Sequence, residues 1–173
     1  AEKVVPDVTE APAWPVLRSQ LMLLAASGAN PAFVLRQAVL DGGLDDARDP
    51  AAVLSWRLDW VERGGPLPWL SGVPAPLTEH PQWGPYLASR SELVRDLAAQ
   101  IREASRATEP RWQEALAADL SPELVAHVSV WRAGMGVPAD DLSPTGSAQV
   151  PGAAARWQHV LDDHLQLSSP ALR

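Results

Sequence analysis

The chain has 173 residues, of which 46% are hydrophobic, so it is long enough and apolar enough to bury a core of domain size. Its net charge of −7 disfavours a nucleic-acid partner, because an acidic surface repels phosphates unless its arginines gather on one face. The absence of cysteine excludes disulfides and thiolate metal sites. No apolar run approaches the ~20 residues of a membrane span, and the first residues contain no apolar signal-peptide core. We therefore expect a cytoplasmic protein with no membrane partner.

Polar residues placed directly before prolines mark the clearest helix starts. Asn30, Asp49 and Ser121 each precede a proline and an apolar-periodic run. Such a side chain accepts a hydrogen bond from an unpaired N–H of the first turn, and the proline has no N–H to leave unpaired. His80 before Pro81 is a weaker version of the pattern, because histidine is not a favoured cap.

Apolar periodicity between these starts and the glycine stops predicts an all-α fold, an irregular bundle of about seven helices. No stretch alternates polar residues with β-branched ones, so no sheet is expected. In the fourth helix, Gly84 and Pro85 either introduce a kink or move the start to Pro85. The expected helices span, in chain order, residues 12–26, 31–40, 50–62, 81–107, 111–118, 122–133 and 152–167.

These helices predict a single helical domain over residues 12–168. A flexible or extended arm, residues 1–11, precedes it, and a short tail, residues 169–173, follows it. Within the domain, the N-terminal helices occupy residues 12–63 and the C-terminal helices residues 81–168.

The segment between the two sets of helices, residues 64–80, is expected to be an ordered, extended crossover. Its first thirteen residues, 64–76, hold four prolines and three glycines, which exclude a helix there. The segment is nevertheless too apolar for a flexible linker. We expect its apolar side chains to pin it against the helices; these are Leu67, Trp69, Leu70 and Val73.

The aromatic residues are unusual, since the chain has eight tryptophans but only one tyrosine and one phenylalanine. Most of the indoles are expected to build the core, and Trp56 is expected to stack on Trp60 one turn later. Trp69 and Trp83 lie in or next to the proline-rich crossover and are the indoles expected to be partly exposed. An exposed indole there is a candidate partner-binding anchor. The alternative is that both simply hold the crossover down.

The run that contains Arg102, Arg106 and Arg111 is the one local cluster of basic residues, and Trp112 follows it. Base stacking on the indole together with charge would suit single-stranded nucleic acid. Interleaved glutamates nearly neutralise the run, so a solvated helix face is the preferred interpretation.

The histidines give only weak signs of chemistry. His159 and Asp163 lie four residues apart on one helix, a spacing that suits two metal ligands but lacks a third. His127 is expected to lie against Trp131 one turn later, with Glu123 as its nearest carboxylate. Phosphate-binding loops and nucleophile elbows are absent from the sequence. We therefore expect no catalytic residue, no metal and no cofactor.

Several tryptophan- and proline-containing phrases stand in a distinctive order. They are Ala13-Trp14-Pro15 through Leu24, DPAAVLSWRLD (49–59), GPLPWL (65–70), PQWGPYLASRSELV (81–94), VWRAGMGVP (130–138) and PTG (144–146). Through these phrases, the chain resembles the C-terminal portion of conjugative relaxase–helicases of the MobF type from high-GC Gram-positive bacteria. The resemblance covers nearly the whole chain.

The resemblance implies a functional setting but no site residue. Family members carry an N-terminal relaxase, with a tyrosine nucleophile and a histidine-ligated metal, followed by a superfamily 1 helicase. Here Tyr86 has no cluster of three histidines, and no Walker motif occurs. The resemblance therefore implies a non-catalytic interaction or scaffolding domain in plasmid mobilisation. Its implied partners are relaxosome or coupling proteins, the secretion apparatus and the rest of its parent chain. The alternative is an accessory domain that binds single-stranded DNA.

Overall fold

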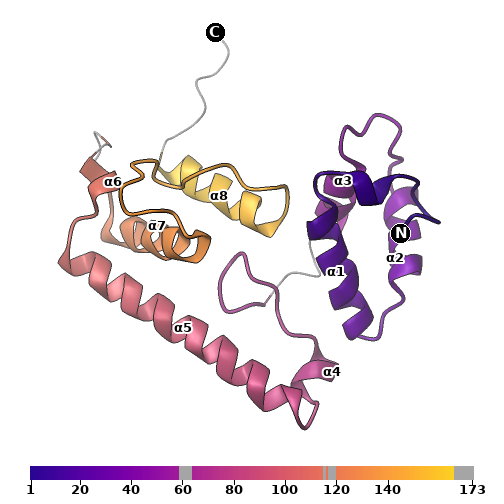
Figure 1. Ribbon diagram of the computed structural model, residues 1–173, viewed down its shortest axis with the longest axis horizontal. Helices are drawn as coiled ribbons and strands as arrows, with labels where there is room; N and C mark the ends of the chain where they lie inside the picture. The colour runs from indigo at the N-terminus through magenta and orange to yellow at the C-terminus, as the bar shows by residue number, and fades with distance from the viewer. Residues whose placement is uncertain (59–63, 115, 117–119, 166–173) are drawn as a thin grey trace. The chain divides into compact units, whose positions relative to one another are not determined.

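The computed structural model describes residues 1–58, 64–114, 116 and 120–165 (Figure 1). Over these residues the chain is all-helical, as expected, and the one pairing of β type is an isolated bridge between Gly64 and Ser71. The elements are a 3₁₀ helix, η1 (Val8–Glu10), and the α-helices α1 (Trp14–Ala26), α2 (Pro31–Leu40), α3 (Pro50–Arg57), α4 (Ala75–Thr78), α5 (Trp83–Ala107), α6 (Arg111–Glu114), α7 (Pro122–Met135) and α8 (Ala153–His164).

Contacts within the chain divide it into two compact units. The N-terminal unit comprises Ala1–Glu92 and Gln149–Arg156, and the C-terminal unit comprises Leu93–Ala148 and Trp157–Arg173. Helices α5 and α8 each contribute residues to both units. The single domain expected over residues 12–168 stays a prediction.

The core of the N-terminal unit is formed by the apolar faces of α1, α2 and α3, which pack together (Figure 1). Buried positions recur at helical spacing, as the apolar stripes of the sequence require. Its fully buried members include Leu17 and Leu24 of α1, Leu35 of α2, and Leu54 with Leu58 of α3 and its C-cap.

The predicted caps begin these helices. The Oδ1 atom of Asn30 accepts hydrogen bonds from the amides of Ala32 and Phe33 at 3.1 and 3.2 Å. Asp49 has two roles, since Oδ1 accepts from Ala52 N at 2.9 Å while Oδ2 accepts from Ala13 N at 3.0 Å. One carboxylate therefore begins α3 and also ties it to the residue that precedes α1.

The N-terminal residues differ from the flexible or extended arm expected over residues 1–11. Val5 and Val8 are buried, with exposed fractions of 7% and 0%, and both belong to the same core as α1 to α3. The Glu2 carboxylate accepts from the amides of Asp7 and Thr9. Two apolar anchors and one carboxylate thus fold this segment onto the unit.

The crossover is not extended throughout. The Gly64–Ser71 bridge and a turn from Leu67 to Leu70 fold it back on itself. The short helix α4 begins at Ala75, inside the stretch from which its prolines were expected to exclude helix. Pro76 lies in the first turn of α4, where the missing N–H would have no partner, so the proline is tolerated.

Helix α5 begins at Trp83, close to the expected start at Pro81. The imidazole Nδ1 of His80 accepts from the amides of Gln82 and Trp83, both at 3.2 Å, in the manner of an N-cap. The Gly84 amide donates to the His80 carbonyl at 2.8 Å. The histidine expected to be a weak cap therefore performs this role, and Gly84 and Pro85 lie within the helix.

Helix α7 supplies half of the buried side chains that the structure describes in the C-terminal unit. Its cap Ser121 accepts from Leu124 N at 3.2 Å, and it ends at Gly136, whose φ of +65° suits glycine. Val128 and Trp131 are fully buried, and Leu161 of α8 is 1% exposed. The ends predicted for the helices over residues 50–62, 111–118 and 152–167 fall on, or next to, positions outside the described residues.

Candidate docking surfaces

An exposed aromatic pair stands at the start of α5. Trp83 is 49% exposed, as expected from the sequence, and Tyr86 is 54% exposed. Their ring centroids are 6.2 Å apart at an interplanar angle of 77°, an edge-to-face contact. The His80 cap and the buried Gly84 fix the helical turn that carries both rings. Together they form a preorganised apolar surface, which we call the Trp83–Tyr86 pair.

Trp69, the other indole expected to be exposed, is buried, with an exposed fraction of 8%. The expectation of exposure was wrong: Trp69 lies in the part of the crossover that folds back at the Gly64–Ser71 bridge, and it is buried there. Trp69 therefore holds the crossover down, which was the alternative drawn from the sequence.

Trp56 is an exposed indole that sequence reasoning missed, since 68% of it is accessible. Its expected stacking partner, Trp60, lies outside the described residues. The buried positions of α3 include Ala51, Leu54 and Ser55, and the helical period places residue 56 away from that face. Periodicity, rather than the general tendency of tryptophan to be buried, was the informative feature.

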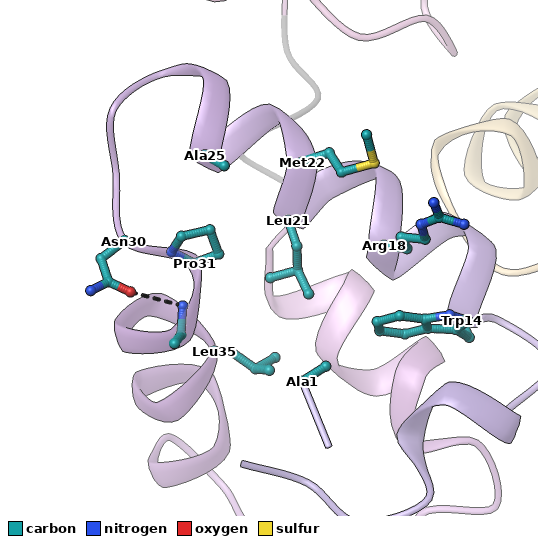
Figure 2. A pocket seen from close by; sticks show the side chains of 10 residues that line it. Ala1, Trp14, Arg18, Leu21, Met22, Ala25, Asn30, Pro31 and Leu35 are labelled. Carbon is teal, nitrogen blue, oxygen red and sulfur yellow. Dashed lines mark hydrogen bonds between the residues drawn. The ribbon is translucent and has the colours of Figure 1, made fainter. Parts of the chain in front are cut away.

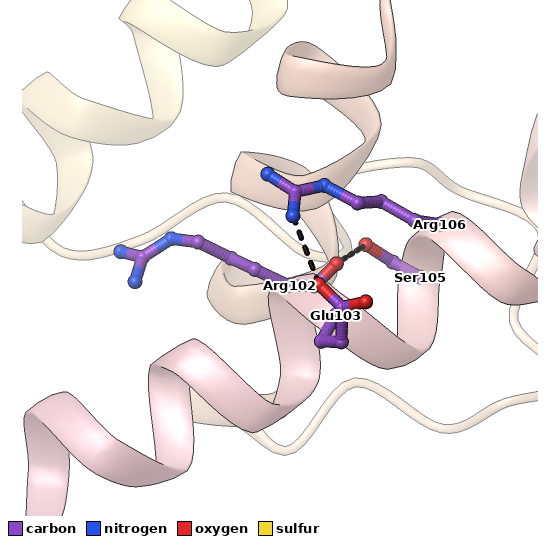
Figure 3. Close-up of polar contacts among 4 residues, drawn as sticks. All are labelled: Arg102, Glu103, Ser105 and Arg106. Atoms are coloured by element: carbon purple, nitrogen blue, oxygen red, sulfur yellow. Dashed lines mark hydrogen bonds and ion pairs between the residues drawn. The ribbon is translucent and has the colours of Figure 1, made fainter.

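The basic run of the C-terminal unit does not present a stacking surface for nucleic acid. Trp112 is 3% exposed, so its ring face is covered. Arg106 pairs with Glu103 at 2.9 Å on the exposed side of α5 (Figure 3), whereas Arg111 is exposed and Arg102 is partly buried. The indole that was expected to work with these arginines is therefore not available for stacking on a base.

The histidines follow the packing interpretation with one correction. His127 lies against Trp157 of α8, with ring centroids 6.2 Å apart, and not against Trp131 as expected. Trp131 is instead fully buried, and its Nε1 donates to the Thr145 carbonyl at 2.8 Å. His159 and Asp163 are both exposed. Among the described residues, no group of three or more His, Cys, Asp or Glu side chains is arranged to hold a metal ion.

A shallow apolar groove of about 400 Å³ lies between α1 and α2 in the N-terminal unit (Figure 2). Leu21 points into it, while Met22, 61% exposed, lies on its rim. Arg18, in the middle of α1, is the one charged side chain among its lining residues. The groove is lined by Ala1, Trp14, Arg18, Leu21, Met22, Ala25, Asn30, Pro31, Ala32 and Leu35.

A buried arginine organises the loop that follows α7, residues 137–148. Arg132 is 6% exposed, and its Nη2 donates to the carbonyls of Pro138 and Asp141, both at 2.7 Å. Its Nη1 donates to the carbonyls of Ser143 at 2.5 Å and Pro144 at 3.3 Å. Burial lowers the pKa of this guanidinium from its ordinary value, and the charge of Asp141 opposes that shift. Arg132 is therefore a clamp that satisfies loop carbonyls.

Helix α8 also holds this loop. The Thr145 hydroxyl donates to the Asp162 carboxylate at 2.7 Å, and the Gln158 amide donates to the Ser147 carbonyl at 3.1 Å. Trp131, Arg132 and Thr145 belong to the phrases that carry the sequence resemblance. The structure gives these residues a common architectural role in positioning the loop.

The loop should loosen in acid through Asp141. Its Oδ1 accepts from Ser143 N at 2.8 Å, and the hydrogen bonds from Ser143 lower the pKa of this carboxyl below 3.8. The stabilisation is complete above that ordinary value and is lost as the pH falls through the lowered folded-state pKa. We expect the Ser143 amide resonance to shift over that range in an NMR titration. Asp141→Asn should abolish the shift; a wild-type shift centred above 3.8 would contradict the assignment.

Comparison of the chain with protein-family models, curated proteins and solved structures finds no match. Among the described residues, no helix has the length and apolar character needed to cross a membrane. The fold defines the chain as an all-α protein over the described residues. Its candidate docking surfaces are apolar and lie on helices.

Proposed function

We propose that this chain is a non-catalytic helical interaction domain that docks a protein partner through the Trp83–Tyr86 pair. The observation that carries the proposal is the exposure of two contacting aromatic rings on a capped helical turn. Aromatic anchors dominate the binding energy of protein interfaces because they bury large areas at a low cost in side-chain entropy. A ring already held in place loses little further freedom on binding.

The sequence resemblance supplies the setting of this proposal. In a MobF-type relaxase–helicase, the domain would act in plasmid mobilisation, in the cytoplasm, by recruiting relaxosome or coupling proteins or proteins of the secretion apparatus. The acidic net charge supports a protein partner over DNA. Burial of Trp112 and the pairing of Arg106 with Glu103 weigh in the same direction.

Truncation of one ring tests the proposal. Trp83→Ala should weaken binding to purified relaxosome or coupling protein by about 2 kcal/mol, a loss of roughly thirtyfold, measured by calorimetry. Trp56→Ala is the matched control, because it removes an even more exposed indole from the same unit. Circular dichroism checks that both variants keep the helical fold.

Three results would overturn the proposal. They are no binding by the wild-type chain to any of these proteins, equal losses in the two variants, or a loss confined to Trp56→Ala. Quenching of tryptophan fluorescence by a single-stranded oligonucleotide, with a steep salt dependence, would favour the accessory DNA-binding alternative instead.

A further inference from the structure

We propose that the groove between α1 and α2 is a second docking site, and that its ligand is an amphipathic α-helix of another protein that carries a carboxylate opposite Arg18. The site is separate from the Trp83–Tyr86 pair and goes beyond the function proposed above. Four observations carry it: the apolar lining, the exposed rim, the position of the one charged side chain in the lining and the distribution of charged side chains along the chain.

The charge distribution selects the sign of the ligand. All 21 acidic residues of the chain lie outside residues 11–40, the segment that forms α1, α2 and their connection. This segment holds two charged residues, Arg18 and Arg36, and both are exposed. Within a protein of net charge −7, both charged side chains of this helical hairpin are therefore positive. A carboxylate that approaches Arg18 meets no nearby side chain of its own sign within the hairpin.

The rim of the groove suits an apolar ligand surface. Met22 exposes 61% of its surface to solvent at the edge of the groove, one turn after Arg18. A methionine side chain is flexible and polarisable, so it adapts to the shape of an apolar partner. Leu21 and Trp14 lie on the same side of α1 and supply the floor and one end (Figure 2).

The backbone of the groove selects a helix rather than an extended peptide. Both walls are α-helices, whose amides and carbonyls are largely paired within each helix. The side chain of Asn30, at the start of α2, is already engaged as a cap. An extended peptide would find few main-chain partners here, whereas a helix satisfies its own and presents apolar side chains at positions i, i+3, i+4 and i+7.

Synthetic peptides test both the shape and the charge of the ligand. The probes are fluorescently labelled amphipathic helices of about 14 residues, about 21 Å long, with one leucine-rich face. One central position beside that face is Glu, Gln or Lys in otherwise identical peptides. Fluorescence anisotropy with the full chain should show that the Glu peptide binds about fivefold more tightly than Gln and at least about tenfold more tightly than Lys.

Charge reversal in the protein provides the matched control. Arg18→Glu should invert the preference, so that the Lys peptide binds more tightly than the Glu peptide. Arg36→Glu changes the net charge of the hairpin by the same amount as Arg18→Glu, but it lies outside the groove. It should therefore leave the preference for the Glu peptide in place. Met22→Glu should weaken all three peptides, whereas Leu40→Glu, at an exposed position away from the groove, should not. Trp83→Ala should leave peptide binding unchanged, which keeps this test independent of the proposed function.

Several outcomes would overturn the inference. Equal affinity for the three peptides, or inversion by Arg36→Glu as well, would remove the role of Arg18. Binding to phosphatidylglycerol vesicles in place of peptides would assign the hairpin to an anionic lipid surface. A dimer of the chain in analytical ultracentrifugation that Arg18→Glu dissociates would assign the groove to a second copy.

Discussion

Replacing Arg132 with methionine is expected to lower the free energy of unfolding by about 3 kcal/mol, because it leaves the carbonyls of the loop after α7 without donors. Methionine retains much of the volume but removes the guanidinium that donates to Pro138, Asp141, Ser143 and Pro144. Because Arg132 has an exposed fraction of only 6%, water cannot reach these carbonyls in the variant unless the surrounding structure opens. Denaturant titration measures the loss.

Two further variants separate the geometry of Arg132 from its charge. Arg132→Lys keeps the positive charge, but one ammonium cannot reach four carbonyls arranged around a planar fork, so an intermediate loss of about 1–2 kcal/mol is expected. Arg90→Met removes an exposed arginine from α5 and should change stability by less than about 0.5 kcal/mol. Hydrogen exchange should accelerate at residues 137–148 in both Arg132 variants. Wild-type exchange there in Arg132→Met would contradict the clamp.

Local sequence rules predicted the helix starts of this chain well. Asn30, Asp49 and Ser121 cap helices as expected, and α2 spans the predicted residues. These features depend on contacts within three or four residues, so the sequence contains all the information that they need. The second bond of Asp49, to Ala13, depends on the packing of α1 against α3 and was not foreseeable from spacing.

Features that depend on distant residues were missed or mistaken. Arg132 donates to carbonyls up to twelve residues later in the chain. Every residue has a backbone carbonyl, so the sequence does not show which of them accept these hydrogen bonds. The available sign was an arginine next to Trp131 near the end of a mostly apolar helix. His127 was matched with the indole one turn along α7, because the sequence could not place Trp157 of α8 beside it.

The candidate surfaces show the same division between local and distant information. The exposure of Trp83 was predicted from its proline-rich surroundings, but the same argument failed for Trp69, which is buried. The groove was not predicted from the sequence, because apolar periodicity does not say which apolar side chains of a helix stay exposed. Met22 of α1 lies on the rim of the groove and is exposed.

Gly84 is the position where a single methyl group should disturb both the fold and the proposed function. A Cβ atom added there would overlap the carbonyl oxygen of Thr78, a backbone atom at the end of α4 that no side-chain rotation can move. Gly84→Ala must therefore shift the first turn of α5 or separate it from α4, at an expected cost of about 2–3 kcal/mol. The measurement is the free energy of unfolding from denaturant titration.

Gly28→Ala is the matched control for this substitution. Its φ is +83° and a Cβ atom there would meet no atom within 4 Å, so it carries only the conformational cost of the left-handed region, about 1 kcal/mol. Because Trp83 and Tyr86 flank Gly84, the larger perturbation should also weaken partner binding, whereas Gly28→Ala should leave it intact. Equal stability losses in the two variants would contradict the steric clash at Gly84. Unchanged binding in Gly84→Ala, despite its lower stability, would show that the α4–α5 contact does not position the aromatic pair.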